Sequence, residues 1–129
     1  MSISVVRFGT PRSSGEGLRL GTVRRPPRGV RKEDYARLNY FDVWLPDLAP
    51  SAPLVSWALR EPFTPKRWAT YERKYLGEMN RAPAQRLIKL LAALSTQLDF
   101  SVGCYCENEA QCHRSLLQKL LVKHGAQMA

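Results

Sequence analysis

The chain has 129 residues and a mass of 14.7 kDa, a length that fits one compact domain built around a single core. Hydrophobic residues make up 44% of the sequence and charged residues 24%, which excludes both a membrane protein and a chain too polar to fold. Twenty Lys and Arg residues against eleven Asp and Glu residues give a net charge of +9. This excess predicts a negatively charged partner, either a phosphate-containing small molecule or a nucleic acid.

The positions of the charged residues and the number of cysteines indicate where the basic surface lies and which cellular compartment holds the protein. Residues 1–40 hold nine basic and three acidic side chains, so the basic excess lies mostly at the front. Three cysteines are an odd number, and no N-terminal apolar run indicates a signal peptide, so we expect reduced thiols in a cytoplasmic protein. No apolar run is long enough to cross a bilayer, and we expect no membrane partner. A homo-oligomer is compatible with the sequence, which does not determine the oligomeric state.

Two strands and an arginine-rich loop are predicted in the first third of the chain. Apolar alternation predicts a strand over residues 3–8, and a second short strand follows over 18–23. Two adjacent prolines then exclude a regular helix or central strand, so a loop displays Arg24, Arg25 and Arg28. Such a loop is commonly only a solvated basic segment, while the functional interpretation is an anion site that uses Arg24 and Arg28.

The middle of the chain predicts one strand and three helices. Aromatic and branched residues indicate a strand over 40–45. Ser51 is a suitable cap for a short helix through Trp57, and Thr64 before a proline is a stronger helix start. The following helix carries an apolar stripe that includes Tyr71, which we assign to the core rather than to a base-stacking platform. A further helix is predicted over 83–95.

The last third supplies the candidate site. A strand is predicted over 100–106 and a helix over 110–124, ended by Gly125. We therefore expect a single α/β domain over residues 1–129, with a small, mainly parallel sheet flanked by helices. In such a fold the carboxyl end of a strand and the next helix N-terminus border the crevice where ligands bind, because free N–H groups and the helix dipole favour negative charge there.

Several chemistries fit the turn between this strand and helix. Cys104, Cys106, Cys112 and His113 are zinc-ligand types, but their spacing lacks the paired loops of common zinc modules, and we predict no metal and no cofactor. A disulfide between Cys106 and Cys112 is sterically reasonable. Near the helix N-terminus and beside His113, the Cys112 thiol is expected to have a lowered pKa, which leaves redox or nucleophilic chemistry open.

His113 and its neighbours complete the predicted site. His113 shares a helical face with leucines, so it is either a buried structural histidine or a catalytic base. Glu107 is placed to orient it or to act as an acid or base itself, and Arg114 could clamp a carboxylate or phosphate. We predict an anion pocket of Arg24, Arg28, His113 and Arg114 with Glu107 nearby.

Three functions follow from this predicted pocket. The first is an enzyme acting on a phosphorylated or nucleotide-like small molecule, with His113, Glu107 and Cys112 as the catalytic candidates. The second is a nucleic-acid-binding module without catalysis. The third is a thiol redox sensor that uses Cys106 and Cys112.

A family resemblance covers nearly the whole chain. The matching positions are, in chain order, Arg24 with Pro27, Arg28 and Gly29; Lys32 and Glu33; Leu48 to Ser51 with Trp57; the helix from Trp68 to Tyr75 with Glu78; and Cys106, Glu107, Cys112, His113 and Arg114. In order and spacing these pieces resemble the YeaO-like family, domain of unknown function 488. The resemblance implies a small cytoplasmic α/β protein of bacteria or archaea and brings no established activity.

Two features depart from the YeaO branch of that family. Val23 and Pro26 stand where the branch has an aspartate and a tryptophan, so no role of those side chains carries over. The branch also lacks the cysteines, His113 and Arg114. Other members of the family carry these residues in the pattern C-E followed by C-H-R. The resemblance therefore implies a zinc site or a thiol nucleophile for a subgroup at most.

Overall fold

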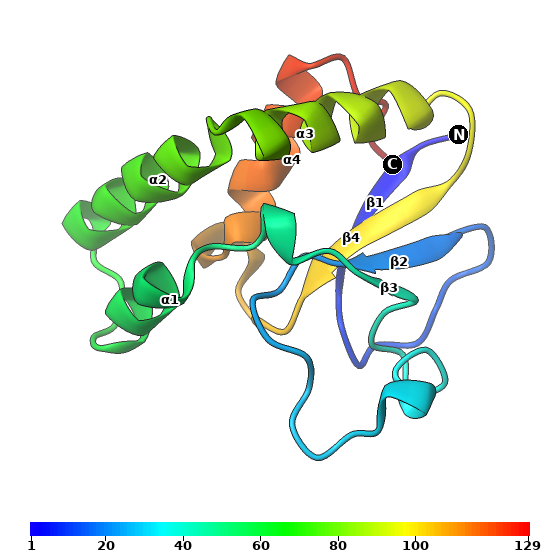
Figure 1. Cartoon of the computed structure of the whole chain (residues 1–129), viewed down its shortest axis with the longest axis horizontal. Helices are drawn as coiled ribbons and strands as arrows, with labels where there is room; N and C mark the ends of the chain where they lie inside the picture. Colours follow the sequence, from blue (N-terminus) through cyan, green and yellow to red (C-terminus); the bar gives the residue numbers. More distant parts are fainter.

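A four-stranded parallel sheet forms the centre of the computed structural model, which describes residues 1–129 (Figure 1). The strand order is β1-β4-β2-β3, and Val102 of the central strand β4 pairs with Val5 on one side and Leu20 on the other. The α/β prediction with a small parallel sheet is confirmed. The strands are β1 Ile3–Arg7, β2 Leu18–Gly21, β3 Val43–Trp44 and β4 Phe100–Cys104.

Four helices pack around the sheet, and their starts follow local capping chemistry. The Ser51 hydroxyl accepts a hydrogen bond from the Leu54 N–H, and the Thr64 hydroxyl accepts one from the Arg67 N–H, as the sequence predicts for these caps. The helices are α1 Ala52–Leu59, α2 Pro65–Met79, α3 Ala82–Leu94 and α4 His113–Lys123, with short 3-10 turns η1 Lys32–Asp34, η2 Pro46–Leu48 and η3 Glu109–Gln111. None of the helices combines the length and apolar character needed to cross a membrane.

The last predicted helix is divided in two. We predicted one helix over 110–124, but η3 ends before Cys112, whose backbone is extended with φ −134° and ψ 150°. The side chain of Asn108 accepts a hydrogen bond from the Ala110 N–H, which starts η3 as a separate turn. The helix α4 then begins at His113 and ends before Gly125, whose φ of +88° is the left-handed stop that the sequence predicts.

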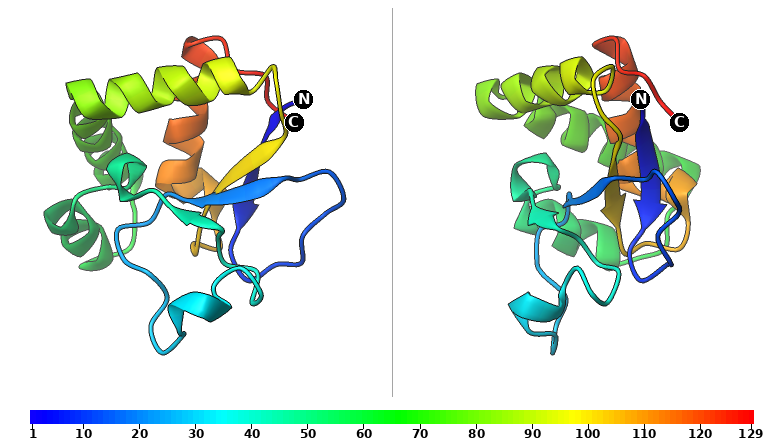
Figure 2. Two further views of the ribbon diagram at one scale, coloured as in Figure 1. Left: turned by 45° about the vertical axis from the view of Figure 1, so that its right-hand side comes forward. Right: turned by 90° about the vertical axis from the view of Figure 1, so that its right-hand side faces the viewer.

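The two faces of the sheet are covered differently. All four helices contribute to one apolar cluster with the strand residues Ile3, Phe100 and Val102. The opposite face, to which Gly21 and Gly103 belong, is covered by aromatic side chains from loops. Figure 2 shows that the loop segment containing η1 lies at the far end of the molecule from α3. The face covered by helices therefore holds the main core, and the carboxyl ends of the strands are free to form a site.

Candidate active site

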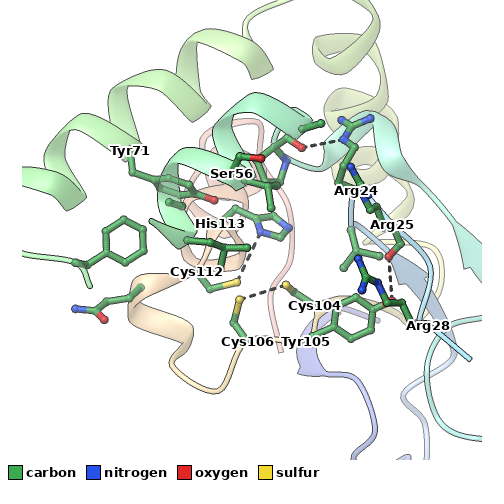
Figure 3. Close-up of a pocket in the computed structure, with 18 residues that line it drawn as sticks. Arg24, Arg25, Arg28, Ser56, Tyr71, Cys104, Tyr105, Cys106, Cys112 and His113 are labelled. Atoms are coloured by element: carbon green, nitrogen blue, oxygen red, sulfur yellow. Dashed lines mark hydrogen bonds between the residues drawn. The ribbon is translucent and has the colours of Figure 1, made fainter. Parts of the chain in front are cut away.

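A pocket of about 490 Å³ opens at the carboxyl ends of β2 and β4 (Figure 3). Its walls come from the segment after β2, from α1, from α2 and the segment before it, and from the turn between β4 and α4. The volume lies within the range of pockets that hold small molecules. The charged, polar and aromatic lining residues are Arg24, Arg25, Arg28, Ser56, Phe63, Tyr71, Cys104, Tyr105, Cys106, Gln111, Cys112 and His113.

The rim of this pocket is positively charged. Arg25 and Arg28 are exposed there, and neither guanidinium group forms an ion pair or hydrogen bond within the protein. Arg24 lines the pocket too, but its guanidinium donates to the carbonyl oxygens of Pro50 at 2.9 Å and Pro46 at 3.1 Å. No Asp or Glu lines the pocket. Arg24 therefore anchors a wall, while Arg25 and Arg28 are free to meet an anion.

The inner end of the pocket holds His113 and the three thiols. The Nε2 atom of His113 lies 2.6 Å from the carbonyl oxygen of Thr22. A carbonyl only accepts, so Nε2 carries a proton, and Nδ1 faces the Cys112 sulfur at 3.7 Å. The sulfurs of Cys104 and Cys106 are 3.6 Å apart, and all three thiol sulfurs lie within 4.8 Å of one another. No disulfide joins any of the three cysteines.

The three thiols differ in pKa. Hydrogen bonds from the Cys104 and Cys106 thiols, reinforced by His113, hold the pKa of Cys112 well below its usual range. The contact with Cys106 and then that with Cys112 raise the pKa of Cys104. For Cys106 the hydrogen bond with Cys104 favours the thiolate, but the Cys112 contact and burial outweigh it and raise the pKa to about 11. The first negative charge in the cluster therefore resides on Cys112.

The side wall is aromatic. Phe63 and Tyr71 pack edge to face with ring centroids 5.3 Å apart, and Tyr105 lies on the other side of the thiols. Tyr71 is buried, as its helical spacing predicts, but its hydroxyl has no protein partner and borders the pocket. Burial raises the pKa of Tyr71, so this hydroxyl stays a donor at neutral pH. Helical periodicity indicated its burial but not its hydroxyl's position.

Two predicted site residues lie outside the pocket. Arg114 is 3% exposed and donates to the carbonyl oxygens of Val6 at 2.9 Å and Cys106 at 2.7 Å, so it is a positioning residue rather than an anion clamp. Glu107 is exposed and 3.6 Å from Arg7 on the outer surface. The structure thus brings together Arg24, Arg28, Cys112 and His113 of the predicted set, with Arg25 beside them.

The fold and the site define a small parallel α/β protein with a cationic pocket at the ends of its strands. The family model described as "Active DUF488-N3 subclade" matches residues 3–125, and the chain therefore belongs to this family, domain of unknown function 488. The resemblance to the YeaO-like proteins is confirmed at the level of the family. Neither the curated proteins nor the solved structures yielded a match to the chain.

Proposed function

We propose that this protein is an enzyme that acts on a phosphorylated, nucleotide-like small molecule bound in the strand-end pocket. The observation that carries the proposal is the pair of unpaired guanidinium groups, Arg25 and Arg28, at the rim of a pocket that no carboxylate lines. Guanidinium groups bind phosphate oxygens through two parallel hydrogen bonds. The family description, with its word "active", is in keeping with catalysis.

The shape and chemistry of the walls support a substrate with a flat ring. A phosphate held by Arg25 and Arg28 leaves the remainder of the molecule beside the aromatic rings of Phe63, Tyr71 and Tyr105. Aromatic side chains stack on nucleobases and similar rings. The free hydroxyl groups of the lining, from Ser56 and Tyr71, and the amide of Gln111 offer hydrogen bonds to the substrate.

The reacting group lies at the inner end, beside His113. Its Nδ1 atom faces the Cys112 sulfur, where it can exchange a proton, and the hydrogen bond from Nε2 to the Thr22 carbonyl fixes the ring orientation. A histidine ring oriented by a hydrogen bond from its second nitrogen is a common arrangement for acid–base chemistry. Glu107 has no part in this proposal because its carboxylate lies on the outer surface.

The pairing of arginines in residues 1–40 argues against a nucleic-acid surface on that segment. In the basic front segment, Arg12 is paired with Asp42, Arg19 with Glu16, and Arg31 with Asp34. Paired guanidinium groups contribute less to attracting phosphate than free ones. The arginines without a partner in this segment are Arg25 and Arg28 at the pocket rim, which favours a small molecule over an extended strand there.

Calorimetric titration of nucleoside monophosphates, their parent nucleosides and inorganic phosphate tests the proposal. A monophosphate is expected to bind at least about tenfold more tightly than its nucleoside, since a charged hydrogen bond contributes about 1.5–3 kcal/mol. The double variant Arg25→Ala with Arg28→Ala should remove that advantage. Arg86→Ala, which removes an exposed charge from α3, is the matched control and should bind like the parent.

Two results would overturn the proposal. One is the absence of monophosphate binding at millimolar concentration. The other is an equal loss in the Arg86→Ala control, which would indicate a general charge effect instead of a site. Tight binding of a mixed-sequence oligonucleotide that is unaffected by the rim variants would favour the nucleic-acid-binding module.

A further inference from the structure

The three thiols at the inner end of the pocket have the spacing of a metal-ligand set. Zn–S bonds of about 2.3 Å in a tetrahedral site place two sulfur ligands about 3.8 Å apart. The sulfurs of Cys104 and Cys106 are 3.6 Å apart, and that of Cys112 completes a group within 4.8 Å (Figure 3). Side-chain adjustments of a fraction of an ångström would bring all three onto one ion.

Backbone contacts hold the three residues in place. The Cys104 carbonyl accepts a hydrogen bond from the Phe8 N–H at 2.9 Å, and the Cys106 carbonyl accepts one from buried Arg114 at 2.7 Å. The Cys112 N–H donates to the Glu109 carbonyl at 3.2 Å, and its extended conformation interrupts what would otherwise be one helix. The break between η3 and α4 thus places the third sulfur beside the other two.

We propose that Cys104, Cys106 and Cys112 bind one thiophilic divalent cation, Zn²⁺ by its ligand chemistry, and leave its fourth position open to the pocket. Three thiolates suit zinc over magnesium or calcium, which prefer oxygen ligands. Each cysteine would give up its thiol proton to solvent as the metal–sulfur bond forms, with no change of oxidation state. Three thiolates on Zn²⁺ leave one negative charge, which the cationic lining offsets.

The open position follows from where the sulfurs lie. All three cysteines line the pocket, and His113 is outside the group of mutually close ligand atoms although its Nδ1 faces Cys112. Three protein ligands with a vacant position are typical of catalytic zinc, whereas structural zinc has four. In this respect the inference rests on the proposed function, because a substrate atom or a water would fill that position next to His113.

Metal binding is tested on the full-length reduced protein without any nucleotide. After treatment with a chelator, titration with Zn²⁺ should show one ion bound per chain and a rise in melting temperature. Co²⁺ in its place should give thiolate-to-metal charge-transfer absorption. Cys106→Ser is the informative variant, because Cys106 is exposed and its loss should leave the fold intact. Its Zn²⁺ affinity should fall by more than about 100-fold. Substitution of a residue that only supports a metal ligand typically lowers metal affinity by about 10–100-fold, so the larger loss identifies a ligand.

Matched variants separate this inference from the proposed function. Glu107→Gln changes an exposed side chain between two ligands and should keep full Zn²⁺ affinity. The double variant at Arg25 and Arg28 should also bind one Zn²⁺, even if nucleotide binding proves absent. His113→Ala should retain one Zn²⁺ if the fourth position is open.

The contrary outcomes are specific. Three thiols that remain reactive toward a thiol reagent in excess Zn²⁺, unchanged Zn²⁺ affinity in Cys106→Ser, or a disulfide in protein purified without reductant would each overturn the metal site. Loss of the ion in His113→Ala would overturn the open position and indicate a closed site with four protein ligands.

Discussion

The Nε2 atom of His113 and the carbonyl oxygen of Thr22 lie 2.6 Å apart, joining the start of α4 to the chain just after β2. This contact predicts that Nε2 of His113 carries a proton in the reduced, metal-free protein. Nitrogen chemical shifts of labelled histidine should show a protonated Nε2. His124, at the end of α4, provides the second histidine signal for comparison. A signal from an unprotonated Nε2 at neutral pH would contradict the assignment.

Arg114→Ala is expected to destabilise the fold. The substitution leaves the partly buried carbonyls of Val6 and Cys106 without their donor, and each unsatisfied group costs up to about 1–3 kcal/mol. Urea denaturation should therefore show a free energy of unfolding lower by about 2–5 kcal/mol. Arg86→Ala, an exposed control, should change it by no more than about 0.5 kcal/mol. Unchanged stability together with lost phosphate binding would instead support the anion clamp that the sequence suggested.

Glu16 makes stability depend on pH at the acid end. Burial alone would raise its pKa, but the hydrogen bond from Arg19 and further bonds from Ser13 and Ser101 lower it from 4.5 to about 2. Because the folded-state pKa is the lower one, the stabilisation is full above about pH 4.5 and is lost as the pH falls toward 2. One pKa unit corresponds to about 1.4 kcal/mol, so the contribution at neutral pH is of the order of 3 kcal/mol.

The variant Glu16→Gln should remove this contribution. Its free energy of unfolding at pH 7 should fall, and its stability should decline less between pH 5 and pH 2 than that of the parent. Part of the decline should remain, because hydrogen bonds from Arg12 and the Arg19 N–H outweigh burial and lower the pKa of Asp42 as well. Chemical denaturation across this pH range measures both effects; parallel curves for variant and parent would contradict the assignment to Glu16.

Gly21→Ala is expected to strain the loop-covered face of the sheet. A Cβ at this position would lie 2.6 Å from a ring carbon of Phe41, closer than real contacts allow. Overpacking of this kind costs about 1–3 kcal/mol. Phe41→Leu should relieve the clash, so the cost of Gly21→Ala should be smaller in that background when both are measured by urea denaturation. Additive effects would show that the cost of Gly21→Ala does not come from the Phe41 ring.

Local chemistry made much of the fold predictable from the sequence. The caps at Ser51 and Thr64 and the stop at Gly125 depend on interactions within a few residues, and all three are present in the structure. The strand-end position of the site was predictable as well, because parallel strands bring their carboxyl ends to one edge. The break at Cys112 was not, since helical periodicity continues across it while its backbone is extended.

The sequence by itself therefore determined the α/β class, the capped helices and the region where His113 and Cys112 meet the arginine loop. Only the tertiary structure decided that Arg25 and Arg28 are free while Arg24 and Arg114 are bound to carbonyl groups. The reason is that a long, flexible side chain is oriented by the acceptors it meets, and those acceptors come from distant parts of the chain. Val6, which accepts from Arg114, lies 108 residues away in sequence, and no local pattern encodes that contact.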